Sequence, residues 1–362
     1  MVYLFKKKRQ LDYVFLISSL YHMYNSLKIL ELEKIKENNT LGFIIAESHK
    51  KTIEGLKISL DCLKFKIHYI SSYKLYELYG IKGLIKKLQT AKKIIKELRE
   101  FYINNFFTAN DKEFISQILL NELNLNNISH IEDGLDIYIN HNSKEPYGKF
   151  LIKKILYPKY VNLPYLGLHP KIKNIWVSNK NLVPYSKFKN KKILEIPNMI
   201  TNNSFLHCIA QKFKFFRFIP NNSFIFWIVT NSEIIKNKYR YLQVYKNFFA
   251  KIEIDNILLK FHPRENSNDF KMSIINLLKD LRRNIIILHD SIATELFISY
   301  LLSIEIKPII LGDISTAIFQ SKIIYDNTLP IISKLKEVLD TLGIDPIIQE
   351  QISKLHYRLF IQ

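Results

Sequence analysis

Hydrophobic and polar positions follow two alternating patterns along the chain. Short apolar runs, each suited to a strand buried on both faces, are separated by longer stretches whose apolar residues recur at helical spacing. In the first half the apolar runs cover residues 12–18, 41–46, 66–70, 101–108 and 128–132. In the second half they cover residues 223–230, 256–261, 284–288 and 307–311. Strands that alternate with helices predict parallel, doubly wound sheets of an α/β protein.

The middle of the chain breaks this alternation. Seven of the eleven prolines lie between residues 141 and 220, which predicts a crossover between two Rossmann-like halves. Two short strands, at 175–178 and 192–196, are expected to open the second half, and a helix is expected at 329–342. We therefore expect an N-terminal domain over 1–175, a C-terminal domain over 176–345 and a terminal helix or tail over 346–362.

Composition narrows the choice of partners. The 362 residues include 53 Lys and Arg against 33 Asp and Glu, a formal net charge of +20. This charge favours anionic partners, namely nucleic acid, an anionic membrane surface or a phosphate-bearing substrate. A hydrophobic content of 48% excludes a disordered chain. Only nine glycines are present, which argues against a glycine-rich phosphate loop.

The cysteines and apolar runs indicate a location. Cys62 and Cys208 are too few for a disulfide framework or a zinc site, and we expect two buried free thiols in a reducing compartment. No apolar run approaches the ~20 residues of a membrane span, and no signal peptide is visible. The expected location is the cytoplasm, with peripheral attachment to the inner membrane as an option.

Two acidic residues and a glycine follow the apolar run at 128–132. Adjacent carboxylates such as Glu132 and Asp133 disfavour one another's ionisation, and a carboxylate there could accept a proton from a sugar hydroxyl. The alternative is a solvated turn, because Asp133-Gly134 is a common turn dipeptide.

A second polar segment ends the strand predicted at 256–261. Pro263 ends the strand, and His262 is flanked by the cations Lys260 and Arg264. A phosphate would find positive charge here, and a protonated His262 could give a proton to a leaving phosphate. The alternative is a structural His-Pro strand end.

The third segment follows the strand predicted at 284–288 and opens a helix. Ser291 and Thr294, followed by Glu295, could present hydroxyls and helix N-terminal amides to a phosphate. The alternative is an N-cap made by Ser291 with Thr294.

With these three segments in this order, the chain resembles bacterial sialyltransferases of the two-domain glycosyltransferase B type. Their signatures are an acidic pair with glycine, a Lys-x-His-Pro segment and a later Ser/Thr-rich segment. The likeness is greatest to the lipooligosaccharide sialyltransferases of glycosyltransferase family 52, with the polysialyltransferases of family 38 second. The resemblance implies a GT-B-like α/β fold, with two Rossmann-like domains and a cleft between them.

The resemblance also implies roles for particular residues. Glu132 would be the general base, with Asp133 beside it, and His262 would be the general acid. Since the family segment has two adjacent Ser/Thr residues, Ser315-Thr316 is an alternative to Ser291 for the phosphate. The residues expected to bind the nucleotide sugar are Gly134, Lys260, Pro263, Arg264, Ser291, Thr294, Glu295, Ser315 and Thr316.

The expected donor is CMP-sialic acid, with no cofactor and no metal. The sequence contains no Asp-x-Asp and no His/Cys cluster with ligand spacing. The expected reaction is an inverting transfer of sialic acid to a terminal sugar of a bacterial surface glycan, in lipooligosaccharide or capsule. One alternative is transfer of glucose or N-acetylhexosamine from a UDP donor. Another is a non-enzymatic nucleotide- or nucleic-acid-binding protein, although no nucleic-acid motif is present and nucleic acid is not an expected partner.

Two basic segments bear on the membrane. Residues 80–99 combine lysines with Ile and Leu at helical spacing, and 212–218 combine cations with aromatic residues. Either could lie on an anionic inner membrane beside a glycolipid acceptor, or be a solvated helix and part of the core with cations at its edge. A homodimer stays open as an alternative to a monomer.

Overall fold

The computed structural model describes residues 9–36, 39–46, 50–72, 80–139, 142, 144–325 and 328–361. The chain forms two compact units. The first contains residues 1–56 and 63–196, and the second contains 57–62 and 197–362.

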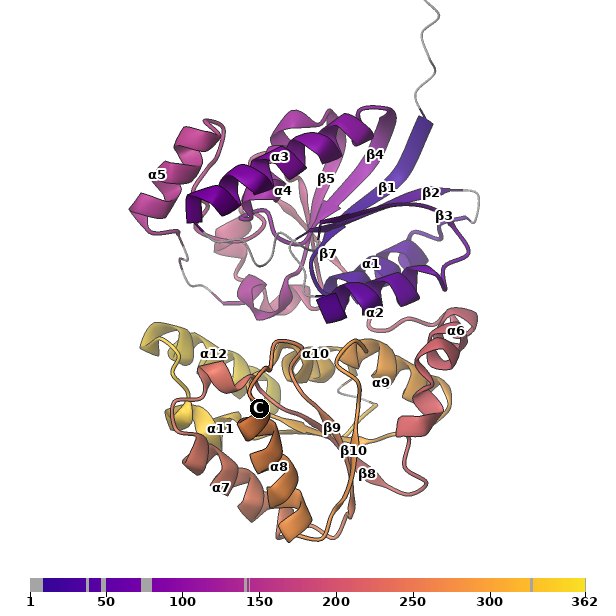
Figure 1. The fold of residues 1–362 in the computed structure, drawn as a ribbon, viewed down its shortest axis with the longest axis vertical. Coiled ribbons are helices and arrows are strands. Elements are labelled where there is room, and N and C mark those ends of the chain that lie inside the picture. Colours follow the sequence, from indigo (N-terminus) through magenta and orange to yellow (C-terminus); the bar gives the residue numbers. More distant parts are fainter. Residues whose placement is uncertain are drawn as a thin grey trace, which may run out of the picture. The chain divides into compact units, whose positions relative to one another are not determined.

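Within the described residues, the first unit holds a seven-stranded parallel sheet in the order β3-β2-β1-β4-β5-β6-β7. Its strands are β1 (Arg9–Ile17), β2 (Thr40–Ala46), β3 (Lys66–Ser72), β4 (Phe101–Thr108), β5 (Leu125–Ile131), β6 (Asn174–Val177) and β7 (Lys192–Glu195). Its helices are α1 (Leu20–Leu32), α2 (Lys50–Leu60), α3 (Gly80–Leu98), α4 (Phe114–Glu122) and α5 (Tyr147–Leu156), with short 3-10 turns η2 (Gly134–Ile137), η3 (Lys180–Leu182) and η4 (Tyr185–Phe188). Figure 1 shows α3 and α4 on one face of this sheet and α1 and α2 on the other.

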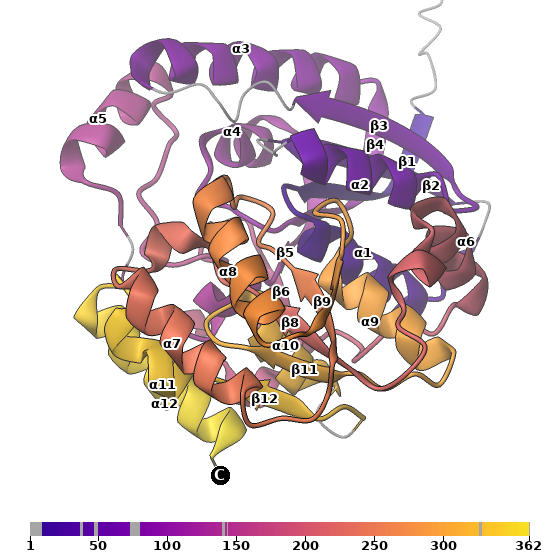
Figure 2. The ribbon, with the colours of Figure 1, turned by 60° about the horizontal axis from the view of Figure 1, so that its bottom comes forward.

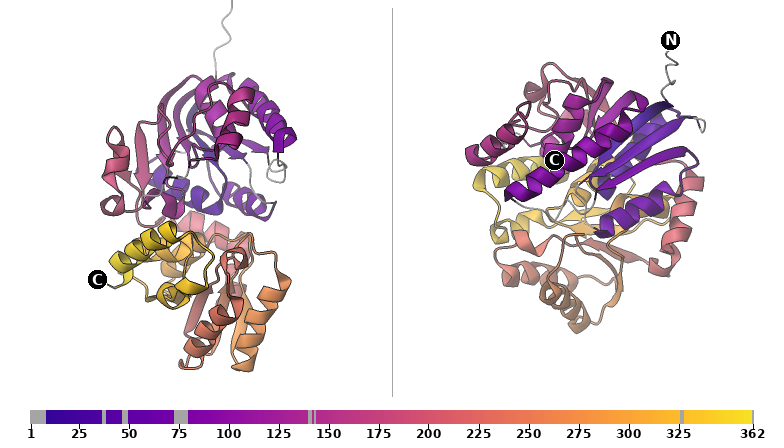
Figure 3. Two further views of the ribbon diagram at one scale, coloured as in Figure 1. Left: turned by 90° about the vertical axis from the view of Figure 1, so that its left-hand side faces the viewer. Right: turned by 45° about the horizontal axis from the view of Figure 1, so that its top comes forward.

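The second unit holds a five-stranded parallel sheet within the described residues, in the order β10-β9-β8-β11-β12. Its strands are β8 (Phe224–Ile228), β9 (Asn256–Lys260), β10 (Asn284–Ile287), β11 (Ile309–Gly312) and β12 (Ile331–Ser333). Its helices are α6 (Asn203–Phe213), α7 (Lys238–Phe249), α8 (Asn268–Asp280), α9 (Thr294–Ser303), α10 (Thr316–Tyr325), α11 (Leu335–Val338) and α12 (Pro346–Phe360), with turns η5 (Phe215–Phe218), η6 (Ser232–Ile234) and η7 (Leu339–Thr341). Helices lie on both faces of each sheet, which confirms the expected α/β class (Figure 3).

Aromatic side chains fill the core of each sheet. In the first unit the ring of Phe15 lies between Phe43 and Phe107, with centroid distances of 5.3 and 4.8 Å. In the second unit Trp227 stacks on Tyr245 at 4.5 Å. Stacked and offset aromatic pairs of this kind bury large apolar areas, and they fix how helices pack on a sheet.

Two expectations about elements were wrong. Strands β6 and β7, expected to open the second half, extend the first sheet, where His130 of β5 pairs with Ile175 of β6. The first unit therefore runs to Ile196 and does not end at 175. The helix expected at 329–342 begins instead with strand β12, because Ile331 and Ile332 pair with β11. Short β-branched runs fit a pleated edge better than a helix.

The expectation of two free thiols was also wrong. Cys62 and Cys208 form a disulfide, with their Cα atoms 5.7 Å apart and 146 residues between them in sequence. Residues 57–62, which include the last residues of α2, belong to the second unit, so the disulfide joins this segment to α6 within that unit. An ion pair between Asp61 and Lys212 at 3.4 Å lies beside it.

In the part of the chain that the structure describes, no helix has the length and apolar character needed to cross a bilayer.

Replacing Cys208 by serine should lower the free energy of unfolding by about 2–5 kcal/mol, because a long loop of the unfolded chain is no longer closed. Urea unfolding without reductant measures the difference, and the same comparison in reductant should remove it. Two thiols that react readily in the folded, unreduced protein would contradict the disulfide.

Candidate functional site

The segment Glu132-Asp133-Gly134 directly follows β5, at the carboxyl edge of the first sheet. Gly134 has φ of +69°, in the left-handed region that glycine adopts without strain. The chain therefore turns sharply after Asp133 and enters η2. Lys187 stabilises the segment after this turn, because its ammonium donates hydrogen bonds to the carbonyls of Asp136 and Ile139. Burial lowers the pKa of Lys187 to about 8.

Glu132 is completely buried and surrounded by donors. Its carboxylate accepts hydrogen bonds from the hydroxyls of Tyr21 and Tyr138, the latter at 2.6 Å. It also accepts from the amide of Ser178 at 2.6 Å and from that residue's hydroxyl at 3.0 Å. Burial, together with the charge of Glu132, raises the pKa of Tyr21 and Tyr138 well above the usual range, so both phenols keep their protons. Glu132 thus joins three segments of the first unit.

Asp133 has a different environment, and its side chain is 30% exposed. One carboxylate oxygen lies 2.6 Å from Nε2 of His22, and the other accepts from the amide group of Asn110 at 3.3 Å. The backbone amide of Ser18 donates to Nδ1 of His22 at 3.2 Å. Because Nδ1 of His22 accepts this hydrogen bond, it carries no proton, so the ring's proton is on Nε2, which donates to Asp133.

The strand order explains why these residues meet. In an open α/β sheet, ligands bind beyond the carboxyl ends of the strands where the winding reverses, here between β1 and β4. Ser18 follows β1 and Asn110 follows β4, while His22 lies in the first turn of α1, which Ser19 caps. The sequence analysis did not single out His22 or Asn110, whose only signal was their place just beyond a strand end.

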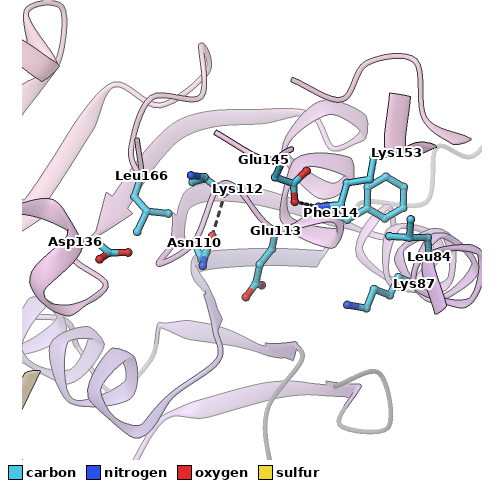
Figure 4. A pocket seen from close by; sticks show the side chains of 10 residues that line it. All are labelled: Leu84, Lys87, Asn110, Lys112, Glu113, Phe114, Asp136, Glu145, Lys153 and Leu166. Atoms are coloured by element: carbon cyan, nitrogen blue, oxygen red, sulfur yellow. Dashed lines mark hydrogen bonds and ion pairs between the residues drawn. The ribbon is translucent and has the colours of Figure 1, made fainter. Parts of the chain in front are cut away.

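The first unit contains a cavity of about 380 Å³, which Asp133 itself does not line (Figure 4). Asn110 links the two, because it lines the cavity and donates to Asp133. Asp136, three residues after Asp133, lines the same space. The volume is in the range of small-molecule sites. The lining residues come from α3, α4, α5, η2 and the loops next to them: Leu84, Lys87, Asn110, Lys112, Glu113, Phe114, Asp136, Glu145, Lys153 and Leu166.

Cations and carboxylates balance around this cavity. Lys153 forms an ion pair with Glu145, and the hydroxyl of Tyr160 bridges them, donating to Glu145 at 3.0 Å and accepting from Lys153 at 3.1 Å. Burial lowers the pKa of Lys112, although the nearby carboxylate of Asp136 acts in the opposite direction. The cavity therefore offers many donors and acceptors without one dominant sign of charge.

In the second unit, Lys260 lies inside the structure and not at its surface. It is the last residue of β9, is buried, and donates to the carbonyls of His289 and Asp290 at 3.2 and 3.0 Å. These bonds hold the loop after β10 against the end of β9.

His262 and Arg264 are more accessible. His262 is half-buried, its Nδ1 accepts the backbone amide of Arg264 at 3.1 Å, and the side chain of Arg264 is exposed. The sharp turn at Pro263 is closed by Glu265, which is buried and accepts from the amide and hydroxyl of Ser232 at 2.6 and 2.9 Å. The turn thus presents His262 at the rim of the second sheet.

The segment around Ser291 does not form the N-cap that was the alternative to a phosphate site. Ser291 is buried, and its hydroxyl lies 2.7 Å from Nδ1 of His289. Helix α9 begins at Thr294 with Ala293 as its N-cap, and no side chain caps it. The alternative of an N-cap made by Ser291 is therefore wrong. Glu295 is buried in the first turn of α9, and its backbone carbonyl accepts a hydrogen bond from the hydroxyl of Tyr325 at 3.2 Å.

Ser315 and Thr316 lie where the winding of the second sheet reverses, between β8 and β11. Ser315 is half-buried and its hydroxyl accepts the amide of Ile318 at 3.1 Å, which caps α10. Beneath it, the buried Asp313 accepts from the hydroxyls of Thr230 and Tyr245, and burial raises its pKa. Sequence reasoning missed Asp313, which holds the ends of these two strands together.

Among the described residues, no group of three or more His, Cys, Asp or Glu side chains could hold a metal ion.

Comparison with known proteins supports the fold. No family model matches the chain, and no curated protein matches it in sequence. Its structure is similar to the UDP-GlcNAc 2-epimerase from Neisseria meningitidis bound to UDP-GlcNAc, with 14% identity, 97% of this chain and 92% of that chain covered, and a TM-score of 0.56. It is also similar to S. aureus MnaA in its co-structure with UDP (12% identity, 98% of each chain, TM-score 0.53). A putative UDP-N-acetylglucosamine 2-epimerase from Listeria monocytogenes gives 11% identity, 98% and 88% coverage and a TM-score of 0.54. At these identities the likeness shows the fold, two Rossmann-like domains of the glycosyltransferase B type.

Replacing Glu132 by glutamine should destabilise the protein by about 2–4 kcal/mol, because an amide nitrogen would face buried donors that now have no acceptor. Urea unfolding measures the change. The matched control is Glu195→Gln, at the exposed end of β7, which should change the free energy of unfolding by less than about 0.5 kcal/mol. Equal stability of the Glu132 variant and the parent would contradict a structural role.

Proposed function

We propose that the chain is an inverting glycosyltransferase that moves a sugar from a nucleotide-sugar donor to a hydroxyl of a glycan. One observation carries the proposal. Asp133 is a partly exposed carboxylate held by His22 and by Asn110, and Asn110 lines a polar cavity near the reversal point of a doubly wound sheet. A general base needs both access to its substrate and a fixed position, and Asp133 combines them.

The resemblance to sialyltransferases gives the base role to Glu132, but the contacts favour its neighbour. The carboxylate of Glu132 is buried and its oxygens already accept from Tyr21, Tyr138 and Ser178. A substrate hydroxyl would have to displace these donors. We therefore assign the proton-accepting role to Asp133 and the role of holding the loop to Glu132.

The cavity that Asn110 lines is suited to the acceptor sugar. Its balanced Lys and carboxylate side chains can exchange hydrogen bonds with hydroxyl groups, while Leu84, Phe114 and Leu166 offer apolar surface to a sugar ring (Figure 4). Balanced charge favours an uncharged terminal hexose over an anionic sugar at this position.

The second unit would hold the donor. His262, half-buried at the strand rim with Arg264 beside it, can give a proton to the leaving phosphate. Ser315 and Thr316 start α10 at the reversal point of the sheet, and we assign the phosphate contact to them in place of the buried Ser291. Lys260 acts through the loop that it supports and does not touch the nucleotide.

The reaction is then a single displacement. As the acceptor oxygen forms its bond to the anomeric carbon, its proton passes to the carboxylate of Asp133. The bond from the anomeric carbon to the phosphate oxygen breaks, and His262 supplies a proton to the leaving nucleotide. One displacement inverts the anomeric carbon.

For the donor we propose CMP-sialic acid, on the resemblance of the three segments to sialyltransferases. A single phosphate requires little positive charge, in keeping with one histidine and one arginine at the rim. A UDP-sugar is the second candidate, favoured by the likeness of the fold to proteins solved with UDP or UDP-GlcNAc.

Replacing Asp133 by asparagine should lower kcat by about 10²–10⁴-fold with CMP-sialic acid and a galactose-terminated acceptor, because the base is lost while its shape is kept. The thermal midpoint should stay near that of the parent, and Glu195→Gln should keep parental kcat. A parental kcat in Asp133→Asn would overturn the assignment of the base.

Thermal unfolding with CMP, CDP, UMP and UDP should identify the donor. A nucleotide at about 100 times its Kd adds about 2.7 kcal/mol of stability. The nucleotide whose base and number of phosphates match those of the donor should therefore raise the midpoint most. We expect CMP to do so. Stabilisation by UDP alone would move the donor to a UDP-sugar, and salt-sensitive RNA binding without any nucleotide effect would overturn the enzyme proposal.

A further inference from the structure

Helix α5 is apolar in composition yet has no buried residue, and all of its residues are described. Its sequence, YGKFLIKKIL, contains six large apolar or aromatic side chains. The most exposed are Tyr147, Leu151 and Ile155, at 74%, 42% and 70%. Their spacing of four residues puts them on one face of the helix. A contiguous row of exposed apolar side chains is typical of an interaction surface, so this face is suited to binding a partner.

Helix α3, which contacts α5, carries further exposed apolar side chains. Ile81 and Ile85, also four residues apart, are exposed on its first turns. These turns lie next to α5, since Leu84 of α3 and Lys153 of α5 line the same cavity and the two helices are in contact (Figure 2). We call the five side chains Ile81, Ile85, Tyr147, Leu151 and Ile155, with the exposed lysines around them, the α3–α5 face.

The exposed charged side chains that α3 and α5 place next to these apolar residues are lysines. Lys82 and Lys86 of α3 and Lys149 and Lys154 of α5 are exposed beside the apolar side chains. Helix α5 contains no acidic residue, and the one acid of α3, Glu97, lies in its last turn. A second copy of the same face would bring lysines against lysines, so self-association is disfavoured, whereas an anionic surface would be attracted.

We propose that the α3–α5 face binds the surface of an anionic phospholipid bilayer. The Ile, Leu and Tyr side chains would enter the boundary between headgroups and acyl chains, and the lysines would remain at the level of the phosphates. The helices lie in the plane of the membrane and do not cross it. Helix α5 contributes exposed apolar and basic side chains to this face as α3 does, although only α3 lies within the basic segment at 80–99.

The position of the cavity gives the face a consequence, which rests on the proposed function. Leu84 and Lys87 of α3 and Lys153 of α5 line the acceptor cavity, so the two helices that carry the face also form part of the cavity wall. A glycan attached to a membrane lipid would therefore reach the cavity without leaving the bilayer surface.

The test is flotation of the full chain with vesicles of phosphatidylethanolamine and phosphatidylglycerol, and separately with vesicles of phosphatidylcholine. The parent should float with the anionic vesicles, and salt should weaken its binding. Leu151→Ser with Ile155→Ser should lower the partition coefficient about tenfold or more, because two exposed apolar side chains are removed without a change in charge. Lys149→Glu with Lys154→Glu should lower it at least as much.

The matched control replaces Ile347 and Tyr357 by serine. Both are exposed apolar side chains on α12, and the control should keep the parental partition coefficient. Because all of these side chains are exposed, the variants should fold as the parent does, which circular dichroism checks. Failure of the parent to float with anionic vesicles, or parental flotation of the α5 serine variant, would overturn the proposal. So would light scattering that shows a dimer for the parent and a monomer for the α5 serine variant, with vesicle binding unchanged.

Discussion

A buried carboxylate must be surrounded by donors, because desolvation of an unpaired charge costs several kcal/mol. Glu132 meets this requirement with the hydroxyls of Tyr21 and Tyr138 and the amide and hydroxyl of Ser178. These groups come from α1, from the segment after η2 and from the end of β6. The hydrogen bonds that the buried Glu132 needs therefore fix the position of the loop that follows β5. The partly exposed carboxylate next in sequence, Asp133, takes its position from that loop.

The second unit also has a buried carboxylate, surrounded by donors, just after a strand. Glu265 is buried, follows β9, and accepts both the amide and the hydroxyl of Ser232. The strand order within the second sheet repeats that of the first five strands of the first sheet. In each unit the polar residues beyond the strand ends divide into two kinds. Glu132, Lys260 and Glu265 are buried and shape the rim, whereas partly exposed groups such as Asp133 and His262 stay accessible on it.

Sequence patterns predicted the alternation of strands and helices and the polar segments after β5, β9 and β10. They could not assign β6 and β7, because a short apolar strand has the same pattern whichever sheet it joins. They could not separate Glu132 from Asp133 either, since the difference lies in burial and comes from Tyr21 and Ser178, which are far away in sequence. The disulfide between Cys62 and Cys208 had no local signal. His22 was hidden inside an apolar helix, and its contact with Asp133 appears only when α1 packs beside β5.

A crystal structure of the chain with CMP and a galactose-terminated acceptor tests the central claim most directly. Our account predicts that the reacting hydroxyl lies within about 3 Å of a carboxylate oxygen of Asp133, the reach of a general base. It also predicts that Glu132 keeps its bonds to Tyr138 and Ser178. An acceptor hydroxyl bound to Glu132, with those bonds broken and Asp133 turned away, would contradict it.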